Sequence, residues 1–146
     1  MSQVRATTER IIDAPPERVR EALADYTQTR PRILTEEFSD YRVESGGQGA
    51  GTVVHWKLAA TRKRVRDCRM SVEQHGDQLV ERDENSSLVT TWTVAPAGEG
   101  SSSVRVSSTW TGASGIAGFF ERRFAPPGLR RIYDGVLAKL DAAVRS

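Results

Sequence analysis

Residues 129–144 read LRRIYDGVLAKLDAAV, and this stretch predicts one long amphipathic helix. Its apolar side chains recur at the three- and four-residue spacing that lines one face of an α-helix. They are Leu129, Ile132, Tyr133, Val136, Leu137, Leu140 and Val144. Burial of that face contributes on the order of 10–20 kcal/mol before the loss of chain entropy is subtracted. We therefore expect this helix to be the central element of the hydrophobic core.

A shorter apolar stripe precedes this helix in GIAGFFERRF (115–124). It carries Ile116, Phe119, Phe120 and Phe124. Proline lacks an amide donor and clashes with the preceding helical turn, so Pro126-Pro127-Gly128 predicts an interruption between two helices. Two alternatives fit that interruption: a fixed kink, or a hinge that lets residues 115–124 close as a lid over a pocket.

Between Tyr41 and Thr111 the pattern changes, because apolar residues alternate with polar ones as they do in β-strands. Short turns rich in Gly, Asp, Asn and Ser separate the runs, which favours an antiparallel meander. The expected strands cover residues 41–45, 52–58, 63–75, 78–83, 88–95 and 103–111.

The N-terminal part adds one more strand and two short helices. Residues 3–12 predict the strand, and Pro15-Pro16 fits the first turn of a helix, where the missing amide costs nothing. Val19 and Leu23 share one face of that helix, and a second helical turn is expected at residues 31–34. The predicted fold class is therefore α+β, with an antiparallel sheet of about seven strands and a long C-terminal helix.

The composition is that of one folded domain. The chain has 146 residues, of which 38% are hydrophobic and 27% charged, and this excludes disordered and fibrous proteins. No stretch approaches the ~20 apolar residues of a transmembrane helix, and no secretory signal is visible, so we expect a soluble cytoplasmic protein. Cys68 is the only cysteine, which excludes an internal disulfide and a cysteine-cluster metal site.

Charge is unevenly distributed along the chain. The net charge is only +2, but arginines are concentrated in residues 62–69 and 121–131. Such segments can attract phosphates or acidic partners, or they can simply be solvated surfaces of a strand and a helix.

Several stretches resemble the START-like, birch-pollen-allergen-like superfamily, which includes bacterial polyketide cyclases and aromatases. They are IIDAPPERVREAL (11–23), Asp25-Tyr26, Gly49-Ala50-Gly51-Thr52-Val53 and the closing helix Leu129–Val144. The resemblance implies a helix-grip fold, in which a curved sheet wraps around the last helix and leaves a cavity. It also implies that residues 1–146 form a single START-like ligand-binding domain. Arg20 and Arg30-Pro31 depart from it, since the superfamily commonly has tryptophan at those places.

The predicted site residues are those expected to face the inside of such a cavity, and apolar pockets with few polar groups are typical small-molecule sites. They are Tyr26, Trp56, Cys68, Met70, Thr90, Trp92, Ser108, Trp110, Phe119, Phe120, Tyr133 and Leu137. Ordinary core packing is the alternative for each of them.

Other chemistry finds little support in the sequence. His55 should point away from the tryptophan face and His75 should be exposed, and neither has a second histidine at metal-ligand spacing, so no metal and no cofactor are predicted. Cys68 is expected to be a buried, inert thiol. Glu81 and Asp83 lie on one face of their strand, as a carboxylate pair or as ion-pair partners for arginines.

Three functions remain open from the sequence. The first is binding, transport or sequestration of a hydrophobic small molecule such as a lipid, polyketide or aromatic metabolite. The second, implied by the resemblance alone, is a polyketide cyclase- or aromatase-like enzyme using Tyr26, Thr90, Ser108 or Tyr133. The third is an interaction protein that binds RNA or an acidic partner through its arginine-rich segments, although nucleic acid is the least expected partner. No catalytic residue, membrane insertion or oligomeric state is predicted.

Overall fold

The order of helices and strands agrees with the sequence prediction. The computed structural model describes residues 3–61, 64–112 and 115–145, and their side chains except at 60–64 and 113–124. The elements are β1 (Gln3–Ile12), α1 (Pro16–Ala24), α2 (Thr29–Ile33), β2 (Phe38–Ser45), β3 (Val53–Thr61), β4 (Arg64–His75), β5 (Gln78–Asp83), β6 (Val89–Pro96), β7 (Ser102–Thr111) and α3 (Gly115–Arg145). The first strand has the predicted bounds, whereas β2 begins before the predicted residue 41.

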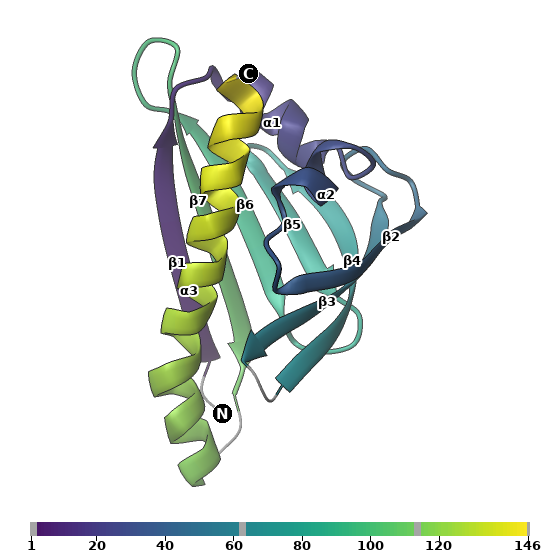
Figure 1. The fold of residues 1–146 in the computed structure, drawn as a ribbon, viewed down its shortest axis with the longest axis vertical. Coiled ribbons are helices and arrows are strands. Elements are labelled where there is room, and N and C mark those ends of the chain that lie inside the picture. The colour runs from purple at the N-terminus through teal and green to yellow at the C-terminus, as the bar shows by residue number, and fades with distance from the viewer. Residues whose placement is uncertain (1–2, 62–63, 113–114, 146) are drawn as a thin grey trace.

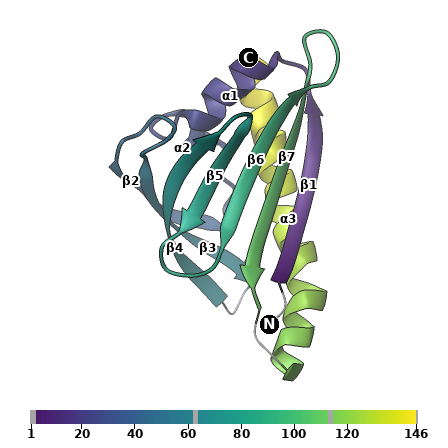
Figure 2. The same ribbon diagram turned by 180° about the vertical axis from the view of Figure 1, so that it is seen from behind.

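One antiparallel sheet of seven strands forms the body of the molecule, in the order β1-β7-β6-β5-β4-β3-β2. The strands from β2 to β7 form a meander, and β1 pairs with β7, so the first and last strands lie side by side at one edge of the sheet. The sheet curves, and its concave face receives α3, while α1 and α2 close one end (Figures 1 and 2). This arrangement confirms the helix-grip fold.

The C-terminal helix supplies the centre of the core, as its sequence predicts. Every residue of the predicted stripe is at most 7% exposed: Leu129, Ile132, Tyr133, Val136, Leu137, Leu140 and Val144. From Thr90 to Val94 in β6, and throughout β7, the even-numbered residues are buried while their neighbours are more exposed, so one face of these strands packs into the core. The sheet thus presents an apolar inner face to the apolar stripe of the helix.

The predicted interruption of the C-terminal helix is wrong. α3 is one helix from Gly115 to Arg145, with Pro126 and Pro127 inside it. A proline in a helix interior costs about 3 kcal/mol or more, because a hydrogen bond is lost and the ring crowds the preceding turn. Pro126 is buried and Ala125 packs against the core, and this tertiary packing offsets the local preference for a break. The helix therefore has no break at Pro126-Pro127 that could serve as the hinge of a lid at residues 115–124.

The edge strand β2 is irregular. Its pairing with β3 shifts register between Ser39 and Arg42 and again between Val43 and Ser45. Asp40 lies in the first of these bulges and has a φ of 52°, a left-handed conformation that residues other than glycine seldom adopt. The bulge turns Tyr41 towards the interior, where its ring stacks on Trp56 at 6.2 Å.

Candidate functional site

The predicted site residues that the structure describes all lie in the interior. Each is at most 6% exposed: Tyr26, Trp56, Cys68, Met70, Thr90, Trp92, Ser108, Trp110, Tyr133 and Leu137. The side chains of Phe119 and Phe120 lie outside the described residues. Alternation in the strands and the stripe on α3 therefore identified interior positions. Contact of these side chains with a ligand stays a prediction.

Six aromatic side chains and one arginine, here called the aromatic cluster, join the helices to the sheet. They are Tyr26, Arg30, Phe38, Tyr41, Trp56, Trp92 and Tyr133. Ring centroids are separated by 5.7 Å for Trp92–Tyr133, 6.2 Å for Phe38–Tyr133 and 5.9 Å for Phe38–Trp56. The stacked Tyr41 donates its hydroxyl to the backbone oxygen of Tyr26 at 2.5 Å. These contacts link α3 to the strands β2, β3 and β6.

Arg30 joins the aromatic cluster from α2. Its guanidinium carbon lies 4.6 Å from the Tyr26 ring centroid and 5.0 Å from that of Trp92, so the cation is sandwiched by two aromatic rings. Its Nη2 forms an ion pair with Glu81 Oε2 at 2.8 Å, and its Nη1 donates to the Leu23 carbonyl at 3.0 Å. Both charged side chains are at most 2% exposed. One arginine therefore connects α1, α2 and β5 inside the core.

The Glu81 carboxylate has three side-chain donors around it. Besides Arg30, it accepts the Tyr26 hydroxyl at 2.5 Å and the Trp92 indole N–H at 3.1 Å. Burial and the Glu81 carboxylate raise the pKa of Tyr26 well above its ordinary value. Burial alone would lower the pKa of Arg30, but Glu81 outweighs it and raises the pKa, so the guanidinium stays charged. Through these three donors, the Glu81 carboxylate ties Arg30, Tyr26 and Trp92 to β5.

The sequence reasoning missed Arg30 as a site residue. From the sequence Arg30 is only a departure from a tryptophan position, because an arginine beside a proline in a short helix resembles a surface residue. The signal that could have revealed it is Glu81, a carboxylate in a predicted strand with apolar neighbours. Ion pairing with an arginine is one of the two alternatives for Glu81, and Arg30 is that partner. Asp83 has a different role, because it accepts the Arg69 and Asn85 amides at 3.0 and 3.1 Å and so shapes a turn.

A second polar group of the interior lies where β6 and β7 pair. Thr90 and Ser108 share a hydrogen bond of 2.7 Å between their hydroxyls, and both are at most 1% exposed. Burial and the Glu81 carboxylate raise the pKa of the Tyr133 phenol on α3, and they outweigh the neighbouring Thr90, which lowers it. The phenols of Tyr26 and Tyr133 therefore remain protonated at neutral pH and can act as hydrogen-bond donors.

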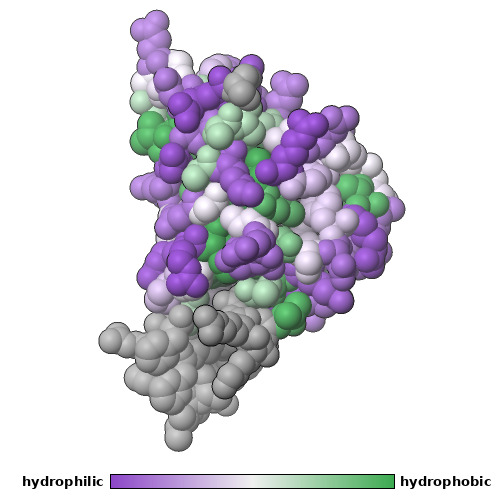
Figure 3. All heavy atoms as spheres, viewed as in Figure 1, coloured by the Kyte–Doolittle hydropathy of each residue, from purple (hydrophilic) through white to green (hydrophobic). Residues whose placement is uncertain are grey.

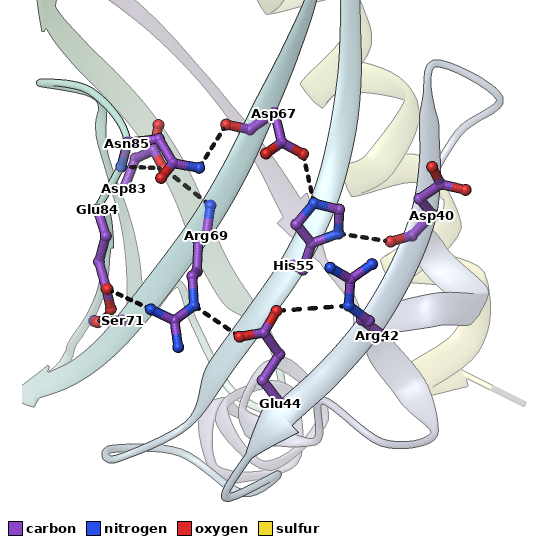
Figure 4. A network of polar contacts seen from close by, with 10 residues as sticks. All are labelled: Asp40, Arg42, Glu44, His55, Asp67, Arg69, Ser71, Asp83, Glu84 and Asn85. Carbon is purple, nitrogen blue, oxygen red and sulfur yellow. Dashed lines mark hydrogen bonds and ion pairs between the residues drawn. The ribbon is translucent and has the colours of Figure 1, made fainter.

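The outer face of the sheet carries a separate polar network on β2, β3 and β4 (Figure 4). His55 points there, away from Trp56, as predicted, with its Nε2 2.5 Å from Asp67 and its Nδ1 2.9 Å from the Asp40 carbonyl. Both ring nitrogens are thus already held by protein oxygens, which leaves neither to serve a substrate as a base. His75 is exposed, as expected, and lies 2.8 Å from Glu73.

Of the described arginines of the first basic segment, Arg69 pairs with His55 in register and belongs to this outer face, whereas Arg66 is opposite Leu58. Arg69 lies between Glu44 at 2.7 Å and Glu84 at 2.8 Å, and the Glu44 carboxylate raises its pKa (Figure 4). Arg66 donates to the Ser86 hydroxyl at 3.2 Å. These contacts fit the solvated-surface alternative. The side chains of residues 62–64 and 121–124 lie outside the described residues.

Cys68 is expected to resist thiol reagents while the protein is folded. Burial, assisted by the nearby Asp83 carboxylate, raises the pKa of the thiol to about 12, and the residue is 0% exposed. Only the thiolate is nucleophilic, so at pH 8 we expect no reaction with 5,5′-dithiobis(2-nitrobenzoate) over minutes, and one equivalent in concentrated urea. Rapid labelling of the native protein would contradict a buried thiol.

A surface hollow of about 260 Å³ lies apart from the predicted site residues. It is bordered by α1, α2 and the end of α3, and its lining residues are Arg18, Glu21, Ala22, Asp25, Thr29, Arg32, Ala143 and Val144. The mixture of both charges and few apolar groups does not select any one ligand class. One of its lining residues, Asp25, accepts several side-chain hydrogen bonds from nearby residues.

Asp25 is expected to make stability depend on pH in the acid range. Burial alone would raise its pKa, but hydrogen bonds from the Gln28 amide and from Thr27, Gln48 and Thr29 lower the pKa from 3.8 to about 2. The stabilisation is therefore complete above pH 4 and is lost as pH falls through 2. Asp25→Asn should cost about 0.5–1.5 kcal/mol at pH 7, and the difference from wild type should vanish near pH 2, measured by urea unfolding. A difference that is the same at both pH values would contradict this assignment.

Most of the face in view in Figure 3 is hydrophilic, and its apolar residues form small separate patches. In the ranges that the structure describes, Ile11 and Val65 are the large apolar side chains left exposed. Within the same ranges no helix is long and apolar enough to cross a membrane.

Similar proteins were found among solved structures and family models. The KanY protein (ms6282), solved by NMR, is 53% identical over 100% of both chains, with a TM-score of 0.91. TTHA0849 from Thermus thermophilus is 22% identical, covers 98% of this chain and 97% of its own, and has a TM-score of 0.75. The Zhui aromatase/cyclase from Streptomyces sp. R1128 is 12% identical, with 99% and 94% covered and a TM-score of 0.70, which shows a shared fold.

No curated protein matches the chain. The matching family model is described as polyketide cyclase / dehydrase and lipid transport, and it covers residues 3–145. That description concerns proteins that handle hydrophobic small molecules, in keeping with a helix-grip fold whose inner face is aromatic. The match spans nearly the whole chain, so the chain belongs to the polyketide cyclase / dehydrase and lipid transport family.

Proposed function

We propose that residues 1–146 act as one ligand-binding domain that holds an apolar small molecule, such as a lipid, polyketide or aromatic metabolite, between the sheet and α3. The observation that carries this proposal is the aromatic cluster, in which side chains from the helices and from strands β2, β3 and β6 meet in the interior. Interiors rich in aromatic groups with a few fixed polar groups are typical of small-molecule sites. Membership of the family supports the same conclusion.

A titration with the neutral fluorophore N-phenyl-1-naphthylamine tests the proposal. We expect tryptophan emission to be quenched with a stoichiometry near one, because Trp56, Trp92 and Trp110 are all in the core. Two substitutions in adjacent residues of α3 provide the matched comparison. Leu137 is 1% exposed and faces the interior, whereas Ala138 is exposed on the opposite side.

Leu137→Phe should weaken binding about 5- to 150-fold, since the larger ring competes with the probe for interior space at a cost of about 1–3 kcal/mol. Ala138→Phe should bind as wild type does. Circular dichroism verifies that both variants are folded. Equal weakening by the two variants, or quenching that needs many equivalents of probe, would place the probe outside the interior and refute the proposal.

A cyclase-like activity is the second candidate, and the buried hydroxyl groups favour it. The Tyr133 phenol stays protonated near Thr90, so it could donate a hydrogen bond to a carbonyl or enol oxygen of a bound polyketide. Turnover of a poly-β-ketone substrate should then fall at least tenfold in Tyr133→Phe while binding of N-phenyl-1-naphthylamine is retained. Unchanged turnover in that variant would remove Tyr133 from the reaction.

A further inference from the structure

Three buried N–H groups of the core have no acceptor among the described residues. They are Arg30 Nε, Trp56 Nε1 and Trp110 Nε1, on residues that are at most 5% exposed. A buried donor without a partner costs about 1–3 kcal/mol, and folded proteins keep such groups few. Other atoms without a hydrogen-bond partner occur on Arg20 and Thr35, which are not members of the aromatic cluster.

Two of these donors belong to the aromatic cluster. Arg30 uses Nη1 for the Leu23 carbonyl and Nη2 for Glu81, while its Nε–H has no acceptor. Trp56 is packed between Phe38 at 5.9 Å and Tyr41 at 6.2 Å, so its ring is fixed while its N–H is unpaired. By contrast, the Trp92 N–H is accepted by Glu81.

The acceptors of the aromatic cluster are already in use. Glu81 Oε2 receives Arg30 and Tyr26, and Oε1 receives Trp92. The backbone oxygen of Tyr26 receives Tyr41. This interior therefore has more hydrogen-bond donors than acceptors. A bound molecule with acceptor oxygens would pair with the donors that are left over.

The charges of Arg30 and Glu81 further restrict which kind of acceptor group a ligand would carry. The positive charge of Arg30 is matched by the negative charge of Glu81 at 2.8 Å, and the indole donors are neutral. A ligand carboxylate would bring a second negative charge into the core without a partner, which is costly in a region of low dielectric constant. A ketone or quinone oxygen accepts the same hydrogen bonds without that cost.

We propose that the ligand of this interior is a neutral apolar molecule with carbonyl-type oxygens, which accept hydrogen bonds from Trp56 Nε1 and Arg30 Nε. Fatty-acid anions and plain hydrocarbons would then be poorer ligands. This inference rests on the proposed binding function, and it concerns which class of apolar molecule is bound.

Three tricyclic probes of one shape test the inference: fluorene, 9-fluorenone and the anion of 9-fluorenone-2-carboxylic acid. Their affinities are measured by displacement of N-phenyl-1-naphthylamine. One added hydrogen bond is worth about 0.5–1.5 kcal/mol, so the ketone should bind about 2- to 13-fold more tightly than the hydrocarbon. The carboxylate should bind more weakly than the ketone.

The variant Trp56→Phe removes the unpaired N–H and keeps an aromatic ring. We expect the affinity ratio of ketone to hydrocarbon to fall towards one, while Trp92→Phe, whose N–H already serves Glu81, keeps the wild-type ratio. A ratio is used because any general loosening of the core affects both probes alike. If Trp56→Phe fails to fold, substitution of Trp56 by 3-benzothienylalanine replaces only the N–H by sulfur.

The outcomes separate this inference from the proposed function. If no probe binds the folded protein, the binding function itself fails, and this inference fails with it. If fluorene and fluorenone bind equally, or if the variant keeps the wild-type ratio, the interior binds apolar molecules but the donor assignment is wrong. Tightest binding of the carboxylate would overturn the preference for a neutral ligand.

Discussion

Glu81→Ala is expected to lower the free energy of unfolding by about 3–5 kcal/mol, because it leaves the Arg30 charge buried without its partner. The loss is this large because both side chains are at most 2% exposed and water cannot replace the carboxylate without opening the core. Tyr26 and Trp92 would lose their acceptor in the same step. Urea unfolding followed by circular dichroism measures the change.

Two comparisons make this prediction specific. Glu84→Ala removes a carboxylate that pairs with Arg69 at 2.8 Å but is 40% exposed, and it should cost no more than about 1 kcal/mol. The double variant Arg30→Met/Glu81→Leu should lose less stability than Glu81→Ala alone, since no unpaired charge remains in the core. If the buried and the exposed carboxylate cost the same, the ion pair does not organise the interior as described.

Ile12→Ala should cost about 2–5 kcal/mol, whereas Ile11→Ala should change stability by no more than about 0.5 kcal/mol. The two residues are neighbours in β1, and strand alternation sends their side chains to opposite faces: Ile12 is 0% exposed and Ile11 is 61% exposed. The large loss combines the transfer of buried methyl groups with the cavity left behind. Equal costs measured by urea unfolding would mean that the register of β1 against β7 is displaced by one residue.

Much of the fold could be predicted from the sequence because periodicity reports the local environment directly. The spacing of Leu129, Val136 and Leu140 identified the buried face of α3, and alternation in β6 and β7 identified the inner face of the sheet. The same alternation placed His55 outside and Trp56 inside. Each of these inferences needs only the geometry of one element.

The errors and omissions have a different origin, since they depend on contacts between distant residues. Pro126-Pro127 predicts a break by local preference, and only tertiary packing of the surrounding helix reverses it. The pairing of Arg30 with Glu81 joins positions far apart in the chain, and no local pattern marks an arginine that will be buried. The irregular start of β2 was also missed, because a bulge hides the alternation of Phe38 and Tyr41.

The bulge in β2 bears on how copies of this protein meet in concentrated solution. β2 has a strand neighbour on one side only, so its other edge could template the addition of a strand from another molecule. The left-handed backbone at Asp40 and the two register shifts interrupt the straight run of amides and carbonyls that such pairing requires. This edge thereby protects the protein against fibril growth by edge-to-edge aggregation.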